Sequence, residues 1–130
     1  MRVLVCGGRD YLDGPHIHAT LDRVHAKHGI TLLIEGGASG ADVRARAWAI
    51  ARKIPFVTEA VTDDDWELYG PAAGPMRNKR MIVAHRPEAV VAFPGGKGTR
   101  DMCAQAKAAR IPVWNVPPSP NPVQRAPWGG

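Results

Sequence analysis

The sequence predicts an α/β protein with a Rossmann-like, mostly parallel sheet of about five strands, flanked by helices on both faces. Two observations predict this class. Short apolar runs lead into glycine-rich loops three times, after Cys6, Ile34 and Phe93. A stretch with helical spacing of apolar residues follows each loop, and a repeated β-α order builds parallel sheets with right-handed crossovers. The 130 residues are enough for one domain with a buried core.

The first half of the chain supplies three strands. Residues 2–6 are β-branched and aliphatic, and a helix pattern follows that begins near residue 14 and ends before Gly29. Residues 31–34 form the second strand and residues 55–57 a third, short one. This half therefore repeats the β-α pattern.

Ser39 and Asp42 have the spacing of a capping box at the start of the helix after the second strand. The spacing predicts a structural role for Asp42 as a cap residue. A carboxylate close to a bound ligand is the alternative. Residues 58–75 then break the pattern and are predicted to be a long acidic loop, in which Trp66 and Tyr69 either stack on a ligand or anchor the loop to the body.

The second half continues with a helix from residue 75 to residue 85, a strand over 89–93 and a helix over 100–110. Residues 111–116 form the last strand, and the proline near its start indicates a sheet edge. Residues 117–130 carry five prolines and no periodicity. The prediction is one ligand-binding domain over 1–116 and a proline-rich flexible tail over 117–130.

Composition narrows the class of protein. No apolar run approaches the ~20 residues of a membrane span, so we expect a cytoplasmic protein without membrane contact. In that compartment Cys6 and Cys103, which have no metal-type spacing, are expected as reduced core residues. His18, Asp22 and His25 share a helix face that could in principle hold a metal, but a solvated polar face is expected because nothing else in the sequence completes a site. The net charge of +5 permits a nucleic-acid partner, but the cations gather near the third glycine loop. This placement suits a small phosphorylated ligand at least as well.

The third glycine loop, residues 93–99, is the strongest functional signal. Three glycines let backbone N–H groups converge at the start of a helix, which attracts anions. Lys97 adds a mobile cation, and Thr99 is either the N-cap or a hydroxyl donor to phosphate. We interpret this segment as a phosphate-binding loop; a tight turn without a ligand is the alternative.

The loops after three parallel strands meet at one edge of the sheet, where open α/β sheets bind ligands. The spacing matches neither the G-x-G-x-x-G dinucleotide fingerprint nor a P-loop. Arg77 and Arg80 are one helical turn apart and are predicted to form a fork around a phosphate or carboxylate, unless they form a solvated basic face. The candidate ligand-binding residues are Gly8, Arg9, Gly36, Gly37, Ser39, Asn78, Gly95, Gly96, Lys97, Gly98 and Thr99.

Three segments in order, residues 36–42, 73–78 and 93–99, resemble the successive motifs of the SLOG superfamily, most closely its YspA-type branch. The resemblance covers residues 1–116. It implies a Rossmann-like sheet that binds a nucleotide or nucleotide-derived ligand. The superfamily includes the LOG enzymes, which cleave the N-glycosidic bond of nucleoside monophosphates, and the DNA-processing protein DprA.

The sequence departs from the LOG motif at its catalytic position. LOG enzymes carry PGGxGTxxE, and Met102 stands where the motif has glutamate, while Asn78 replaces the lysine of the LOG Arg-Lys motif. Asp101 is turned by about 100° around the helix from position 102 and is a poor substitute. Arg77, Asp42 and Asp10 are the remaining catalytic candidates, and Asp65 is a further carboxylate.

Three functional hypotheses follow. The first is a binding module for a nucleotide or nucleotide sugar with no required cofactor, bound nucleotide or phosphate being its ligand. The second is a LOG-like N-glycosidase, and the third is single-stranded DNA binding, ranked last because aromatic residues are few. A homodimer is expected from the resemblance alone, with Met76, Met81 or Trp48 either at the interface or in the core.

Overall fold

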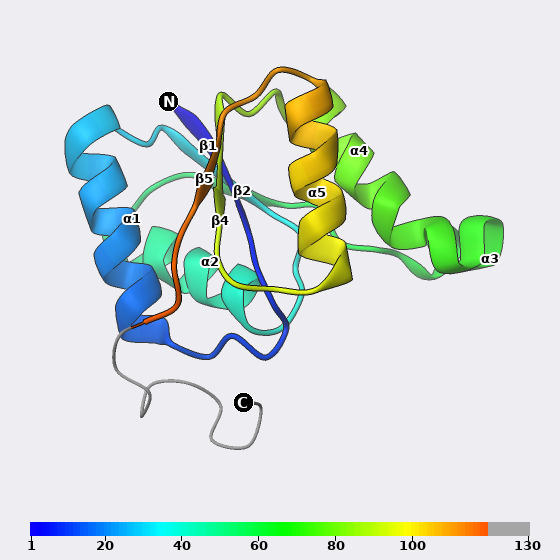
Figure 1. Cartoon of the computed structure of the whole chain (residues 1–130), viewed down its shortest axis with the longest axis horizontal. Coiled ribbons are helices and arrows are strands. Elements are labelled where there is room, and N and C mark those ends of the chain that lie inside the picture. Colours follow the sequence, from blue (N-terminus) through cyan, green and yellow to red (C-terminus); the bar gives the residue numbers. More distant parts are fainter. Residues whose placement is uncertain (120–130) are drawn as a thin grey trace.

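The computed structural model describes residues 1–119 and contains one parallel sheet of five strands. The strands are β1 (Arg2–Cys6), β2 (Leu32–Glu35), β3 (Phe56–Thr58), β4 (Ala89–Ala92) and β5 (Val113–Asn115). Their order is β3-β2-β1-β4-β5, and every neighbouring pair is parallel (Figure 1). The predicted Rossmann-like α/β class is confirmed, and β5 lies at an edge as its proline indicated.

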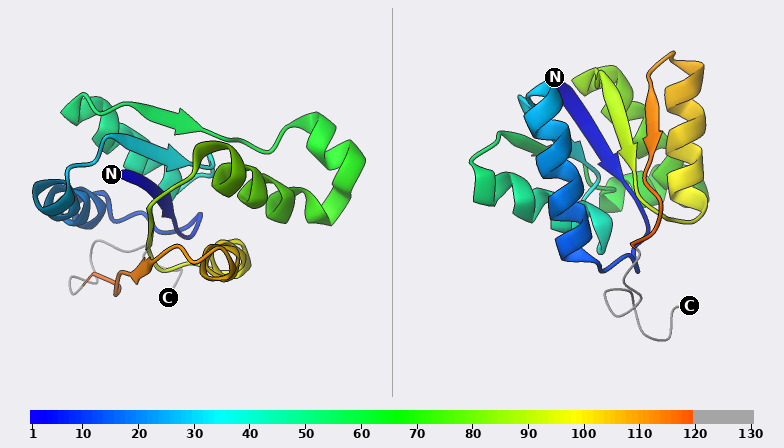
Figure 2. Two further views of the ribbon diagram at one scale, coloured as in Figure 1. Left: turned by 90° about the horizontal axis from the view of Figure 1, so that it is seen from above. Right: turned by 60° about the vertical axis from the view of Figure 1, so that its left-hand side comes forward.

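Helices cover both faces of the sheet (Figure 2). They are α1 (Gly14–His28), α2 (Ala41–Arg52), α3 (Asp63–Tyr69), the 3-10 turn η1 (Gly70–Ala72), α4 (Ala73–His85) and α5 (Lys97–Ala108). Helices α1 and α2 pack on one face, whereas α4 and α5 pack on the other. Helix α3 lies at the end of the molecule away from α1.

Alternation along β1 divides the core between the two faces. Val3 and Val5 join the cluster under α1 and α2, whereas Leu4 and Cys6 join the cluster under α4 and α5. These side chains are all buried, as expected for a parallel sheet covered on both faces. Trp48 lies in the first cluster, so this residue, like Met81 in the second, is a core residue within the protomer.

The strand order reverses between β1 and β4, and this reversal positions the site. The chain moves outward from β1 to β2 and β3, and returns to the other side of β1 with β4. A crevice opens at such a switch point because neighbouring connections leave in opposite directions. The two loops that border it are joined, since the N–H of Gly8 donates to the carbonyl of Pro94 at 2.8 Å.

The predicted loop over residues 58–75 is wrong. Residues 63–69 form α3 and residues 70–72 form η1. Thr62 caps α3 in a capping box with Asp65, so the acidic run lies where helix N–H groups favour carboxylates. Trp66 and Tyr69 are 56% and 40% exposed and do not lie in the buried core. The Thr-x-x-Asp pattern was the missed signal.

Two predicted helix starts are also wrong. The N-cap of α2 is Gly40 and makes no side-chain cap bond, so Ser39 and Asp42 do not form a capping box. Helix α5 begins at Lys97, three residues before its predicted start, and its N-cap is Gly96. Thr99 therefore lies inside the first turn and is not the N-cap.

Other expectations concern the chain ends, the membrane and the cysteines. Residues 120–130 of the predicted tail lie outside the described residues, so the boundary at residue 116 stays a prediction. No helix within residues 1–119 is both long and apolar enough to cross a bilayer. Cys6 is buried, Cys103 is partly buried, and both are free thiols.

Candidate functional site

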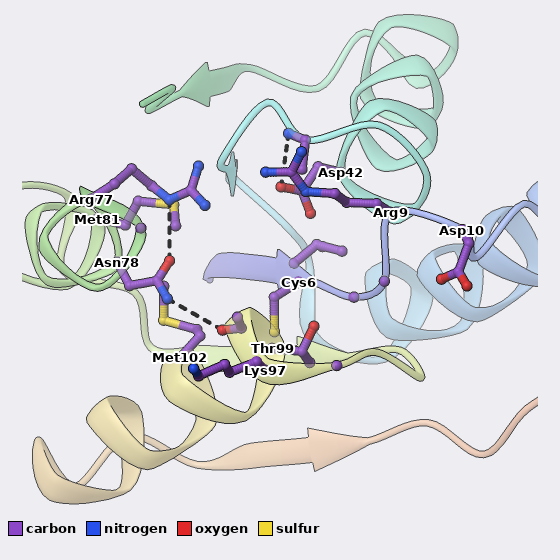
Figure 3. A pocket seen from close by; sticks show the side chains of 17 residues that line it. Cys6, Arg9, Asp10, Asp42, Arg77, Asn78, Met81, Lys97, Thr99 and Met102 are labelled. Atoms are coloured by element: carbon purple, nitrogen blue, oxygen red, sulfur yellow. Dashed lines mark hydrogen bonds between the residues drawn. The ribbon is translucent and has the colours of Figure 1, made fainter. Parts of the chain in front are cut away.

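A cavity of about 400 Å³ lies at the carboxyl end of β1, between the starts of α2 and α5 and the first half of α4 (Figure 3). Ten of the residues singled out from the sequence line it. They are Gly8, Arg9, Asp10, Asp42, Arg77, Asn78, Gly96, Lys97, Gly98 and Thr99. Segments from residue 8 to residue 99 of the chain thus meet at one place.

Four predicted ligand contacts do not line this cavity: Gly36, Gly37, Ser39 and Gly95. The Ser39 hydroxyl donates to the carbonyl of Arg9 at 3.4 Å. Gly95 lies on the other side of its loop, beside a second groove. There a Cβ would stand 2.7 Å from the backbone nitrogen of Gly8, so glycine lets the two loops touch.

In the loop over residues 36–40, carboxylates of the protein already accept hydrogen bonds from the N–H groups of Gly36, Gly37 and Ala38. One oxygen of Asp42, Oδ2, accepts from the N–H groups of Gly36 and Ala38, both at 3.2 Å. Glu35, which is fully buried, accepts from the N–H of Gly37 at 2.7 Å and from the hydroxyl of Thr58. The N–H groups of Gly36 and Gly37 therefore bond to carboxylates of the protein and are not available to a ligand in the cavity.

Burial raises the pKa of the Asp42 carboxyl from 3.8 to about 6. The neighbouring charge of Glu35 acts in the same direction, whereas the N–H groups of the loop and the guanidinium of Arg77 oppose it. Asp42 is 6% exposed. The cavity wall therefore carries a carboxyl group that titrates close to neutral pH.

The start of α5 differs, because its N–H groups have no internal anion. Gly96 provides no side-chain cap, and the backbone N–H groups of Lys97, Gly98 and Thr99 have no hydrogen-bond partner within residues 1–119. These are the first three donors of a twelve-residue helix. Their geometry and the helix dipole favour an anion at this end of the cavity.

Three cations face the same cavity, from Arg9, Arg77 and Lys97. None of the three forms an ion pair within residues 1–119, since the ion pairs there join other residues. The pKa of Arg77 is lowered chiefly by burial; the charge of Asp42 opposes this shift, and the charge of Arg9 adds to it. Two nearby arginines that form no ion pair within residues 1–119 favour an anion in the cavity.

The predicted fork of Arg77 and Arg80 is not formed. Arg80 donates to both oxygens of Asp65, at 3.1 and 2.9 Å, and lies 3.5 Å from Glu59. Its cation holds the pKa of Asp65 below the ordinary value. Asp65, the further carboxylate considered above, therefore pairs with α4 and does not line the cavity.

Hydrogen bonds hold Arg77 in place. Its Nη1 donates to the carbonyl of Gly36 at 2.6 Å, and its Nε donates to Asn78 at 3.1 Å. Asn78 in turn donates to the carbonyl of Gly98 at 3.3 Å and to Asp101 at 2.9 Å. Asn78 thus connects Arg77 to the first turn of α5.

Met102 lines the cavity where the LOG motif has its glutamate, and it is 1% exposed. Asp101 accepts from Asn78 and from Gln105, both at 2.9 Å, and does not line the cavity. The carboxylates in the cavity wall are therefore Asp42 and the exposed Asp10.

Sequence reasoning missed the cavity residues that are small or apolar. They are Val5, Cys6, Gly7, Ala38, Gly74 and Met81. The position of Cys6 at the end of a strand was a usable signal. No local pattern distinguishes the other five from core or turn residues, because they line the cavity only as a result of how α2, α4 and α5 pack around the end of β1.

Comparisons with known proteins identify the family of the chain. Residues 1–69 match the YspA, cpYpsA-related SLOG family. Gene 61 protein of Mycobacterium phage D29 is 37% identical over 124 residues, which cover 92% of this chain and 98% of that protein.

A similar solved structure is that of DNA processing protein A (DprA) from Streptococcus pneumoniae. It superposes with a TM-score of 0.69 at 16% identity over 92% of this chain, a likeness of fold. This chain covers 51% of that structure, about half its length. From the matched family and the relative in phage D29, the chain belongs to the YspA, cpYpsA-related SLOG family.

Proposed function

We propose that this protein binds a nucleotide or a nucleotide-derived ligand, with the phosphate at the start of α5. The observation that carries the proposal concerns residues 1–119: three N–H groups without a partner there, at Lys97, Gly98 and Thr99, belong to residues that line the same cavity as three cations that form no ion pair there. A phosphate satisfies both features at once, because its oxygens accept several hydrogen bonds and carry negative charge.

The rest of the cavity supports a ligand larger than phosphate. A volume of about 400 Å³ lies within the ~300–1,000 Å³ of ordinary small-molecule sites. Met81 and Met102 provide an apolar surface for a ring, and Asp42 provides an acceptor. Membership of a SLOG family supports a nucleotide as the source of these groups.

Titration calorimetry with AMP, GMP, CMP and UMP tests the proposal, after native mass spectrometry of the purified protein for a ligand that copurifies. We expect Lys97→Ala and Arg77→Ala to weaken binding at least about tenfold each, since a charged hydrogen bond contributes about 1.5–3 kcal/mol. Lys79→Ala is the matched control, because Lys79 is an exposed cation on α4 outside the cavity. Equal affinities in all four proteins would contradict the proposed phosphate site.

A LOG-like N-glycosidase is the second candidate, and the raised pKa of Asp42 supports it. A carboxyl group with a pKa of about 6 suits acid or base catalysis near neutral pH. The experiment is incubation with nucleoside monophosphates while free base is measured. In that case Asp42→Asn abolishes base release and leaves ligand bound; no release by the unmodified protein would reject the enzyme and retain the binding module.

Single-stranded DNA binding is a third candidate, supported by the net charge of +5 and by a fold shared with a DNA processing protein. Polymer binding predicts a steep loss of affinity with added salt, because each phosphate contact releases counterions. The same calorimetry with an oligonucleotide at two salt concentrations tests it. A flat salt dependence would reject this candidate.

A further inference from the structure

We propose that Asp42 recognises the sugar of the bound nucleotide, so that the site selects ribonucleotides over 2′-deoxyribonucleotides. This inference rests on the proposed function, and it names the ligand class of the same site. In this arrangement the phosphate lies at the start of α5, and an oxygen of Asp42 accepts a hydrogen bond from the ribose 2′-hydroxyl.

The two oxygens of Asp42 have different surroundings. Oδ2 accepts from the N–H groups of Gly36 and Ala38, which fixes the carboxylate. Oδ1 has no hydrogen-bond partner within residues 1–119, and the residue lines the cavity (Figure 3). The Asp42 residue is more than nine-tenths buried, but Oδ1 is not among the buried polar atoms that lack a partner, so this oxygen is exposed to the cavity. A ligand hydroxyl group that donates to this fixed carboxylate oxygen makes a charge-assisted hydrogen bond.

Arg77, the cation near Asp42, does not take this role. Arg77 comes near Asp42, since a Cβ on Gly36 would stand 2.6 Å from its Nη1 and 3.1 Å from Oδ2 of Asp42. The guanidinium nevertheless donates to the carbonyl of Gly36 at 2.6 Å, and the two side chains form no ion pair. The acceptor therefore stays available to a ligand.

The two ends of the cavity, at Asp42 and at the start of α5, favour different chemical groups of a ligand. A phosphate placed against Asp42 meets a carboxylate, and the N–H groups of Gly36, Gly37 and Ala38 are already bonded to Glu35 and Asp42. The anion of the ligand is therefore favoured at α5, and a neutral donor is favoured at Asp42.

One residue, Gly8, joins the two ends. Its N–H donates to Pro94 of the α5 loop at 2.8 Å, and its carbonyl accepts from Ala41 of α2 at 3.2 Å. The start of α2, with Asp42 as its second residue, thus lies close to the phosphate end of the cavity. The sugar is the part of a nucleotide that is bonded to the phosphate, which favours a sugar hydroxyl over the more distant base.

The test compares matched pairs of ligands by titration calorimetry: AMP with dAMP, GMP with dGMP, and CMP with dCMP. We expect the ribonucleotide to bind about tenfold or more tightly within each pair, the effect of one hydrogen bond to a charged group. Asp42→Asn should reduce this ratio to near one while it retains the two N–H bonds of the loop. Asp64→Asn, an exposed carboxylate of α3, is the control and should keep the ratio.

The outcomes separate this inference from the proposed function. If no nucleotide binds, both are overturned. If both members of each pair bind equally, or if Asp42→Asn leaves the ratio unchanged, this inference alone fails. A change in preference among bases with an unchanged ratio would assign Asp42 to the base and would also overturn it. Circular dichroism of each variant confirms that the ratio is measured on folded protein.

Discussion

The loops over residues 36–40 and 94–96 have the same sequence pattern, but within residues 1–119 carboxylates of the protein accept from N–H groups only at the first of these strand-to-helix junctions. Each follows a buried strand, is rich in glycine and leads directly into a helix whose N-cap makes no side-chain bond. In the first loop, N–H groups donate to the carboxylates of Glu35 and Asp42. In the second, the N–H groups of Lys97, Gly98 and Thr99 have no partner within residues 1–119.

This difference shows what a glycine-rich junction does and does not specify. The pattern provides N–H donors between a strand and a helix, but a carboxylate at the second residue of the helix can satisfy donors of the loop, as Asp42 does for Gly36 and Ala38. Asp42 lies at that place in α2, whereas Gly98 lies at the corresponding place in α5. The first turn of α5 contains no carboxylate, so its N–H groups are available to an external anion.

The largest effect is expected from Gly40→Ala. Gly40 has a φ of +82°, and a Cβ there would stand 2.3 Å from the carbonyl oxygen of Gly8. Backbone strain and this clash should lower the free energy of unfolding by more than about 3 kcal/mol. Chemical denaturation measures it. Gly96→Ala is the matched control in the other loop, where a Cβ meets nothing within 4 Å; a comparable loss there would contradict the reasoning.

Asp42→Asn is expected to stabilise the protein at neutral pH. The pKa of Asp42 rises from 3.8 to about 6 on folding, so between these values the native state binds more protons than the unfolded state. Stability therefore falls as pH rises from about 4 to 6, and above that range the ionised group costs up to about 3 kcal/mol. The asparagine variant avoids this cost.

Thermal unfolding from pH 4 to pH 8 measures this prediction. The variant should melt at a higher temperature than the unmodified protein at pH 8, and the difference should shrink toward pH 4. A difference that does not vary with pH would mean that burial does not disfavour the charged form of Asp42. The same variant is expected to lose sugar selectivity, so stability and function oppose one another at this position.

Thr99→Asp should place a carboxylate in the first turn of α5, one residue after the position that corresponds to Asp42 in α2. A carboxylate in the first turn of α5 can accept from the free N–H groups and compete with phosphate. We expect nucleotide affinity to fall at least about tenfold, roughly 1.4 kcal/mol, by calorimetry. Thr99→Asn is a neutral variant of similar shape and should bind more tightly than Thr99→Asp. Equal affinities would show that charge in this loop does not decide binding.

The smallest effect on binding is expected from Arg80→Ala. Arg80 is one turn from Arg77 on α4 but pairs with Asp65 at 2.9 Å. Its loss should lower the melting temperature slightly, as for partly exposed ion pairs, and leave nucleotide affinity unchanged. Arg77→Ala, in contrast, should weaken nucleotide binding at least about tenfold. A large loss of affinity in Arg80→Ala would show that α3 supports the site.

Much of the fold could be predicted because the pattern is local. The five strands have short apolar runs, and the glycine loops and helix periods between them specify a parallel α/β sheet. The acidic residues of α3 were mistaken for a loop, because charge is compatible with both a solvated segment and a helix start. The Thr62–Asp65 capping box decides between them.

The sequence by itself also determined which residue types gather at the site: a glycine loop with Lys97 and Thr99, an arginine on α4, and Met102 in place of a glutamate. Only the tertiary structure decided their partners. It pairs Arg80 with α3, gives Arg77 no ion pair within residues 1–119, and turns Asp42 from a predicted cap into a fixed acceptor in the cavity wall. The physical reason is that hydrogen bonds and ion pairs depend on contacts between segments far apart in the chain, which local spacing does not encode.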